Sequence, residues 1–475
     1  MDYRDFIKKV GLIMRNMTLS AIALAVNGVI YYDEKSDYGK EASCVVIDSR
    51  LIEEDGIFVA TVGERVDGHS FIDQVFDKGA MGVICEKLPE SAKGPCILVK
   101  DSFQALKDLA AFYRAQISIK VVGIVGSVGK TSTKEMVAAV LSAHYNVLKT
   151  EGNFNNEIGV PLTIFRIRDA HEVAVIEMGI SDFGEMDRLG AIVRPNYVVF
   201  TCIGPCHLEY LGDLDGVLKA KTEVIPHMSD KGIIFINGED EKLALIDGNM
   251  ALGREVVSFG SDSNDVVYAS DRESLGLEGT RFMANFPDNS HYEMVVPLPG
   301  YHMVDNAIAA AAVGFRMGLN LEEIRRGMSN VVALSGRGHL IHTERFLIVD
   351  DCYNASPKSM CAAIDLMQDA LGRKVAILGD MFELGEESDK LHGEVGEYAA
   401  TNGIDSLICV GSNAKHIYET ARLHEELELR FYPNKELLLK AINDNSNILK
   451  DGDTILVKAS HGMGFSEVVD KLQEL

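Results

Sequence analysis

The sequence predicts an α/β protein of three domains. Short runs of β-branched and aliphatic residues alternate with helical stretches along the chain, which is typical of largely parallel sheets covered by helices. The length of 475 residues suits three domains of about 150 residues each. The pattern breaks near residues 116–120 and 334–338, so we expect domains at 1–116, 117–334 and 335–475.

Eight apolar runs are the candidates for buried strands, because each is short, rich in branched side chains and bounded by turn residues. They cover residues 121–125, 173–176, 197–201, 232–236, 346–349, 375–378, 407–410 and 454–457. A helix is expected over residues 134–141. A second is expected over residues 358–367, because Ser356 is a good cap residue and Pro357 suits the first helical turn.

The composition limits the possible partners. Apolar residues make up 47% and charged residues 25% of the chain, which predicts ordinary globular cores. The formal net charge is −25, and no Lys/Arg-rich cluster interrupts the acidic background. Such a surface repels polyphosphate backbones, so we expect no nucleic-acid partner, whereas a few local cations can still hold a small anionic substrate.

The cysteines and the N-terminal segment indicate the compartment. The eight cysteines are scattered, which fits free thiols in a reducing cytoplasm. Cys202 and Cys206 lie near His207, but a structural zinc site needs four ligands at tighter spacings, so we favour no zinc here. Residues 1–9 are mixed in charge and the apolar run 19–26 is too short to span a bilayer. We therefore expect a cytoplasmic protein without a signal peptide or membrane insertion.

The segment 126–132 carries the strongest chemical signal. It follows the expected strand 121–125, precedes the expected helix, and consists of Gly126, Ser127, Val128, Gly129, Lys130, Thr131 and Ser132. Backbone amides of such a loop point at phosphate oxygens, the lysine adds a positive charge, and the threonine hydroxyl can bind Mg²⁺. Ile124 stands where the general phosphate-loop pattern has a glycine, which fits a shorter G-x-x-G-K-T variant. The loop predicts an enzyme that consumes ATP.

Polar residues follow two further strands. Glu177 closes the expected strand 173–176, and ligands of open α/β sheets bind at the carboxyl ends of strands, so Glu177 is a candidate Mg²⁺ ligand. His207 follows the next strand, and Lys219 and Lys221 come soon after it. By themselves a lone histidine is usually structural and a lone lysine usually solvated.

Taken in order, these motifs resemble the Mur ligases, the ATP-dependent ligases of peptidoglycan precursor synthesis. The resemblance rests on segments 126–132, 153–161, 177–179, 207–209 and 220–221 in the middle of the chain. It continues at 48–50, 56–60 and 67–71 before them, and at 306–310, 336–338, 350–357, 379–385 and 457–460 after them. It therefore covers essentially the whole chain. Ser460 is followed by His461 where an arginine is common, which puts a role for a C-terminal arginine in doubt.

The resemblance implies a role for each domain. The N-terminal domain would bind the UDP-linked substrate, the central parallel sheet would bind ATP, and the C-terminal domain would be Rossmann-like. Lys130, Glu177, His207 and Lys221 would be catalytic, and Thr131, Glu177, His207 and Lys221 would hold two Mg²⁺ ions. Since an ammonium group cannot bind a cation, Lys221 would carry a carbamate formed with CO₂ on the neutral amine; Lys219 is the second choice.

The remaining binding residues are also implied by the resemblance. Asn306, Arg337 and Asp351 would contact ATP together with the phosphate loop. The uridine nucleotide would be held by Ser49, Arg50, Gly63, Asp67, Gly68 and His69, and the muramoyl peptide by Asn155 and Asn156. Within the family, segments 350–357 and 379–385 are most similar to members that add D-alanyl-D-alanine to UDP-N-acetylmuramoyl-tripeptide. We expect a monomer that joins these two substrates.

Two other functions remain as alternatives. A regulatory phosphate-loop NTPase would hydrolyse nucleotide without an acceptor amine or a modified lysine. An amide ligase such as a polyglutamate-adding enzyme would share the ATP chemistry, but the expected uridine-binding segment argues against it. The sequence does not say whether the third peptide residue is lysine or diaminopimelate.

Overall fold

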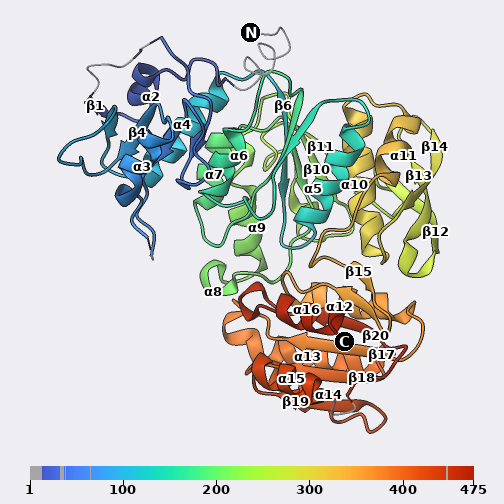
Figure 1. Cartoon of the computed structure of the whole chain (residues 1–475). Helices are drawn as coiled ribbons and strands as arrows, with labels where there is room; N and C mark the ends of the chain where they lie inside the picture. The colour runs from blue at the N-terminus through green and yellow to red at the C-terminus, as the bar shows by residue number, and fades with distance from the viewer. Residues whose placement is uncertain (1–12, 33–36, 38, 65, 445–447) are drawn as a thin grey trace.

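The computed structural model describes residues 13–32, 37, 39–64, 66–444 and 448–475. These residues form three sheets, which follow one another along the chain and are covered by helices (Figure 1). Segment 1–9, for which the sequence predicts no signal peptide, lies outside the described residues. Among the described residues, no helix is both long and apolar enough to cross a membrane.

The N-terminal sheet has five strands in the order β1-β5-β4-β3-β2. Its strands are β1 (Val29–Tyr31), β2 (Val45–Val46), β3 (Ile57–Val59), β4 (Gly82–Cys85) and β5 (Cys96–Leu98), and its helices are α2 (Leu19–Ala25), α3 (Ile72–Asp77) and α4 (Ser102–Ala115). All neighbouring strands are parallel except the edge pair β1 and β5. The two-residue strand β2 ends the sheet on the other side.

The central sheet has nine strands in the order β14-β13-β12-β11-β10-β9-β6-β8-β7. They are β6 (Lys120–Val125), β7 (Val147–Lys149), β8 (Val173–Glu177), β9 (Tyr197–Phe200), β10 (Ile233–Asn237), β11 (Glu255–Gly260), β12 (Val267–Ser274), β13 (Thr280–Asn285) and β14 (His291–Val296). The strands from β7 to β12 are parallel, whereas β13 and β14 add an antiparallel edge. The sheet is therefore mixed, and its far edge departs from the expected parallel arrangement.

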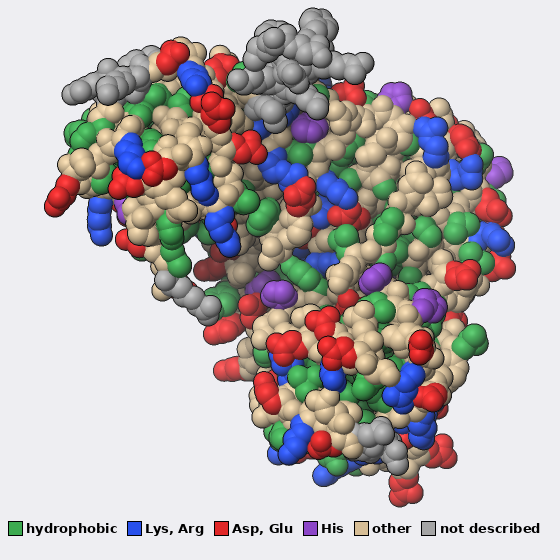
Figure 2. Space-filling view, in the orientation of Figure 1, with side chains coloured by type: hydrophobic (Ala, Val, Ile, Leu, Met, Phe, Trp, Pro, Cys, Tyr) green, Lys and Arg blue, Asp and Glu red, His purple; other side chains and the backbone are tan. Residues whose placement is uncertain are grey.

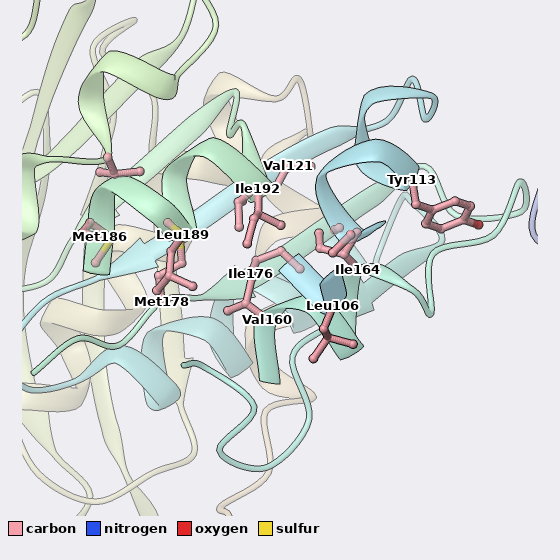
Figure 3. Packing of buried hydrophobic residues seen from close by; sticks show 14 of the residues in the cluster. Leu106, Tyr113, Val121, Val160, Ile164, Ile176, Met178, Met186, Leu189 and Ile192 are labelled. Carbon is pink, nitrogen blue, oxygen red and sulfur yellow. The ribbon is translucent and has the colours of Figure 1, made fainter. Parts of the chain in front are cut away.

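The helices of the central part cover both faces of this sheet. They are α5 (Lys130–Leu141), α6 (Gly159–Ile164), α7 (Glu185–Val193), α8 (Leu208–Leu211), α9 (Leu214–Thr222), α10 (His302–Arg316) and α11 (Leu321–Ser329). Side chains of β6 alternate between two cores: Val122 and Ile124 pack with α5 and α10, while Val121 and Val125 pack with α4, α6 and α7. Figure 3 shows the second core, in which Leu106 and Tyr113 of α4 lie near Val160 and Ile164 of α6. Helix α4 thus joins the N-terminal sheet to the central one.

The C-terminal sheet has six strands in the order β15-β16-β20-β17-β18-β19. They are β15 (His339–His342), β16 (Leu347–Asp350), β17 (Lys374–Gly379), β18 (Ser406–Val410), β19 (Glu428–Tyr432) and β20 (Thr454–Lys458); the helices are α12 (Pro357–Gln368), α13 (Ser388–Thr401), α14 (Ala414–Ala421), α15 (Lys435–Asn443) and α16 (Ser466–Gln473). Only β15 is antiparallel to its neighbour. As expected, Ser356 caps α12, and its hydroxyl accepts from the Ser359 amide.

All eight predicted strands are present, and the α/β architecture is confirmed. The strand β6 lies inside its sheet, between β8 and β9. Because β6, β8 and β9 are parallel, the segments that follow them meet at one edge of the sheet. That edge carries the candidate site.

Candidate active site

The phosphate loop joins β6 directly to α5. Gly129 adopts a left-handed conformation with φ +84° and is the N-cap residue, so the helix begins at Lys130. The expected helix over residues 134–141 is therefore corrected to an earlier start. Lys130, Thr131 and Ser132 lie in the first helical turn, where backbone amides have no partner within the helix. These amides and the helix dipole favour an anion at this end.

The segment after β9 supports this loop from one side. A Cβ atom on Gly126 would lie 1.9 Å from the Thr201 Oγ1, so only glycine fits there. The Thr201 hydroxyl donates to the Val128 carbonyl at 2.5 Å. The Cys206 thiol donates to the Ser127 hydroxyl at 3.2 Å. These bonds fix the loop's shape through residues outside the sequence motif.

Lys130 extends back across the loop. Its ammonium group donates to the carbonyls of Gly126 at 2.8 Å and Ser127 at 3.2 Å. The side chain therefore holds its charge over the backbone that the sequence predicts will bind phosphate. A flexible lysine with three donors can exchange such carbonyls for phosphate oxygens.

Glu177, at the end of β8, is buried beside the loop. Its carboxylate accepts from the Thr131 hydroxyl at 2.9 and 3.1 Å and from the Asn155 amide at 2.8 Å. The Glu177 backbone amide donates to the Thr150 hydroxyl at 3.0 Å. A hydroxyl and a carboxylate side by side are the oxygen ligands that Mg²⁺ prefers, so Thr131 and Glu177 fit one such ion.

Lys134 is a buried cation that no sequence motif pointed to. Only 1% of its side chain is exposed, and its ammonium group lies 2.9 Å from the Glu135 carboxylate and 4.0 Å from that of Glu177. It also donates to the Thr150 carbonyl at 2.8 Å. Lys134 comes three residues after Thr131 in the expected helical region, and residues three apart in a helix are neighbours. This spacing could have predicted that Lys134 lies near the phosphate loop.

Asn156 follows Asn155 in the chain, but its side chain bonds to the backbone and not to Glu177. Its side-chain oxygen accepts from the amides of Ile158 at 3.1 Å and Gly159 at 2.9 Å, and so closes the turn that leads into α6. Of the two asparagines expected to hold the muramoyl peptide, only Asn155 contacts Glu177.

His207 meets a residue from the C-terminal domain. Its Nδ1 lies 2.5 Å from an Oε atom of Glu383. Both residues have left-handed backbones, with φ of +52° and +62°, which is uncommon for residues other than glycine. Burial lowers the pKa of His207; Glu383 opposes this, and the charges of Lys221 and Lys130 add to it. Glu383 was missed as a site residue, although it lies in the segment 379–385 used for the resemblance.

Lys221 is buried in α9, with 1% of the residue exposed. Burial lowers its pKa to about 8, and the nearby Lys130 acts in the same direction, while Cys206 and Cys202 oppose it. Lys219 is exposed and lies over the Phe183 ring, with its Nζ 5.5 Å from the ring centre. Burial therefore favours Lys221 over Lys219 as the lysine that loses its proton.

The expected ligands of a second metal ion are Glu177, His207 and Lys221, and a lysine binds a metal ion only after it has lost its positive charge. Within the described part of the chain, no group of three or more His, Cys, Asp or Glu side chains is arranged to hold a metal ion. The residues fit a second Mg²⁺ only if Lys221 becomes an anion, as the carbamate expectation requires.

The nucleotide candidates lie on both sides of the second domain boundary. Asn306, on α10, accepts from the Thr133 hydroxyl at 3.0 Å, and a Cβ atom on Gly129 would lie 3.0 Å from the same side-chain oxygen. Asn306 therefore touches the phosphate loop. Arg337 and Asp351 have their partners in the C-terminal domain: the Arg337 guanidinium lies 4.0 Å from the Tyr353 ring centre, and Asp351 pairs with a lysine at 2.6 Å.

Two uridine candidates follow β2. Ser49 is buried, and its carbonyl accepts from the Lys78 ammonium at 2.8 Å. The Arg50 side chain is 84% exposed and pairs with Asp48 at 2.6 Å, which lowers the pKa of Asp48 to about 2. An exposed guanidinium held by one carboxylate leaves several donors free for a ligand.

The other uridine candidates form a tight turn. The His69 Nδ1 lies 2.7 Å from the Asp67 carboxylate, while its Nε2 accepts from the Glu86 amide at 2.9 Å. Both ring nitrogens are therefore engaged within the protein. A Cβ atom on Gly68 would lie 2.8 Å from a backbone oxygen, and the Gly63 amide donates to the backbone at 2.9 Å. These bonds give the turn a structural role.

Three family models match the chain, and together they cover most of it. The "Mur ligase family, catalytic domain" matches residues 41–114, the "Mur ligase middle domain" residues 124–314, and the "Mur ligase, glutamate ligase domain" residues 336–461. The chain belongs to the Mur ligase family.

Several of the similar proteins share one name within the Mur ligase family. The UDP-N-acetylmuramoyl-tripeptide--D-alanyl-D-alanine ligase of Bacillus subtilis (strain 168) is 36% identical over 470 residues, which are 97% of this chain and 99% of that protein. The Escherichia coli (strain K12) ligase of the same name is 35% identical over 97% of this chain and 99% of that protein. A crystal structure of MurF from Acinetobacter baumannii aligns with a TM-score of 0.87 at 31% identity, over 97% of this chain and 99% of that chain.

A folylpolyglutamate synthase of Mycobacterium tuberculosis, in complex with ADP and AMPPCP, aligns with a TM-score of 0.61 at 18% identity, over 78% of this chain and 94% of that chain. This likeness shows a common fold and nothing more.

Proposed function

We propose that this protein joins D-alanyl-D-alanine to the tripeptide carboxylate of UDP-N-acetylmuramoyl-tripeptide, with conversion of ATP to ADP and phosphate. The observation that carries the proposal is the buried Thr131–Glu177 pair beside the phosphate loop, in a chain that matches the ligases of this name along almost its whole length. A MurF ligase from Thermotoga maritima, 28% identical with a TM-score of 0.78 over 91% of this chain and 97% of that chain, was solved in complex with ADP.

The chemistry has two steps. The tripeptide carboxylate attacks the γ-phosphorus of ATP, which gives an acyl phosphate and ADP. The amine of the dipeptide then attacks the acyl carbon, and phosphate leaves as the amide bond forms. Because both reactants of the first step are anions, positioning and charge neutralisation limit the rate. Lys130 neutralises phosphate charge in this scheme, and the amides of residues 126–132 hold the phosphates.

Thr131 and Glu177 would bind one Mg²⁺, and Glu177, His207 and carbamylated Lys221 a second. When bound, these ions neutralise phosphate and acyl oxygens and orient them for attack. The carbamate forms when the neutral Lys221 amine attacks the carbon of CO₂ and releases one proton. Burial and the lowered pKa of Lys221 support this assignment, since the neutral amine is the reactive form.

The remaining binding residues are assigned by domain. In this proposal Ser49, Arg50 and the turn from Gly63 to His69 bind the uridine nucleotide, in a domain of residues 1–116. Domain 117–334 binds ATP with Asn306 at the adenine, and Asn155 and Asn156 orient the muramoyl peptide. Domain 335–475 adds Arg337 and Asp351 to the nucleotide when it closes.

In this proposal the protein acts as a monomer in the cytoplasm.

Acidic and basic side chains are interspersed on the face shown in Figure 2, and the net charge of the chain is −25. This surface supports the expectation that the protein binds small anionic substrates rather than nucleic acid.

An ADP-release assay over a matrix of UDP-muramoyl peptides and amine acceptors tests the function. We expect turnover only when a UDP-muramoyl-tripeptide and D-alanyl-D-alanine are both present, and the matrix identifies the third residue of the peptide. ADP release without any acceptor would instead identify a nucleotide switch. Turnover with a different acceptor would identify another amide ligase.

A further inference from the structure

The contact between His207 and Glu383 joins two domains at the edge of the site. Glu383 follows β17 in the C-terminal sheet, whereas His207 follows β9 in the central sheet. The His207 Nδ1 is buried, and its distance to the Glu383 carboxylate is 2.5 Å, although the two groups are not aligned as in an ideal hydrogen bond. The short turn Gly385–Glu387 also packs against α8, which starts after His207. A contact of this kind places the C-terminal domain directly against a candidate site residue.

The segment that carries Glu383 is held firmly in its own domain. The Met381 amide donates to the Nε2 of His392 at 2.9 Å, and the Phe382 amide donates to the Ser460 hydroxyl at 2.9 Å. His392 is completely buried. Glu383 is therefore presented by a rigid segment, although half of its side chain is exposed.

The backbone at the contact is unusual on both sides. His207 and Glu383 each adopt a left-handed conformation that glycine would adopt more easily. Such conformations persist where surrounding structure enforces them, and they cluster at functional sites. An ordinary surface ion pair would need neither of them.

We propose that Glu383 is a positioning residue that holds the His207 ring with its hydrogen on Nδ1, which leaves the Nε2 lone pair free to face the reaction. A carboxylate that accepts from one ring nitrogen fixes both the tautomer and the orientation of a histidine that acts through its other nitrogen. Because Glu383 belongs to the C-terminal domain, His207 is oriented only while that domain is docked. The role assigned to Nε2 rests on the proposed function.

The tautomer of His207 can be measured in the full-length protein without substrate or metal. Nitrogen NMR of histidine-labelled, deuterated protein distinguishes a protonated ring nitrogen from a bare one, and the variant His207→Gln assigns the signal. We expect hydrogen on Nδ1 in the unchanged protein and on Nε2 in Glu383→Leu. Glu383→Gln should keep hydrogen on Nδ1, because its amide oxygen can still accept. The exposed Glu386, in the same segment, provides the control Glu386→Leu, which should leave the signal unchanged.

Kinetics provide the second readout. Loss of such a supporting partner typically lowers activity by about 10- to 100-fold. We expect that loss in kcat for Glu383→Leu, with KM for ATP nearly unchanged and substantial activity in Glu383→Gln. An unchanged His207 signal in Glu383→Leu, or hydrogen on Nε2 in the unchanged protein, would overturn the proposal. If the tautomer shifts as expected but no substrate pair releases ADP, positioning stands and the proposed function fails.

Discussion

Replacement of Lys221 by arginine distinguishes two roles for this residue, as a carbamate or as a positive charge. Lys221 is buried, and its pKa is lowered to about 8 from 10.5. At pH 7 a lysine of pKa 8 is neutral about one tenth of the time, compared with about one part in three thousand at pKa 10.5. The site therefore raises the concentration of the reactive amine by roughly 300-fold. Arginine stays protonated and cannot take up CO₂, so Lys221→Arg should be inactive.

The same pKa gives the direction of the pH dependence. Because the neutral amine increases as pH rises toward 8, carbamate occupancy at a fixed concentration of dissolved CO₂ should rise between pH 6 and pH 8. Removal of CO₂ should lower activity at every pH in this range, and the loss should be greatest at the lowest pH, where the least amine is neutral. Added bicarbonate should restore it.

The assay is ADP release in CO₂-depleted buffer, before and after bicarbonate is added. Carbon NMR of protein equilibrated with labelled CO₂ detects the carbamate directly, and Lys219→Arg is the matched control because Lys219 is exposed. Lys221→Ala should lose at least about 100-fold in activity, and acetate or formate should restore part of it. Full activity in Lys221→Arg would show that the site uses the positive charge, and the carbamate would be rejected.

Three further substitutions test the loop and its surroundings. Lys130→Ala should lower ADP release by at least about 100-fold and leave the thermal midpoint nearly unchanged. Normal turnover in this variant would refute the assignment of residues 126–132 as the loop that binds the phosphates of ATP. Lys134→Met should cost about 3–5 kcal/mol of unfolding free energy in urea titrations, because it leaves the buried Glu177 carboxylate without its lysine and removes one of the two lysines that pair with Glu135. The control Lys149→Met, at a partly exposed lysine that pairs with the same Glu135, should cost at most about 1 kcal/mol, and equal losses would contradict the reasoning. Gly126→Ala should abolish binding of a fluorescent ATP analogue, since the added Cβ would lie 1.9 Å from the Thr201 hydroxyl; binding of normal strength would show that the loop can move aside.

Much of the fold could be predicted because buried parallel strands appear in the sequence as short, continuous apolar runs. Runs such as residues 121–125 and 173–176 are apolar throughout, since helices cover both faces of the sheet. The antiparallel edge was missed for the opposite reason. β13 alternates buried and half-buried residues, and Asn289 supplies a positive φ in the turn to β14. An alternating pattern with a turn residue was the available signal.

The site could be predicted in part. A loop motif and a strand end predict Thr131 and Glu177 locally, and the hydrogen bond between them agrees with the metal-binding hypothesis. Glu383 could not be found in the same way, because it reaches His207 from another domain and only the docking of the two sheets brings them together. Sequence spacing records contacts within a helix or strand, whereas a contact between domains depends on the whole arrangement.

The charges at the site explain why one lysine is suited to modification. The chain has a net charge of −25, yet Lys130, Lys134 and Lys221 gather near the phosphate loop. Each cation is stabilised differently. The Lys130 ammonium group donates to two backbone carbonyls, and Glu135 pairs with Lys134. Within the described residues Lys221 has no carboxylate partner, and it meets the cost of burial by releasing its proton more easily. Among the described residues, Lys221 is the one of the three with neither a carbonyl nor a carboxylate partner for its ammonium group, which supports it as the lysine that reacts with CO₂ in the proposed function.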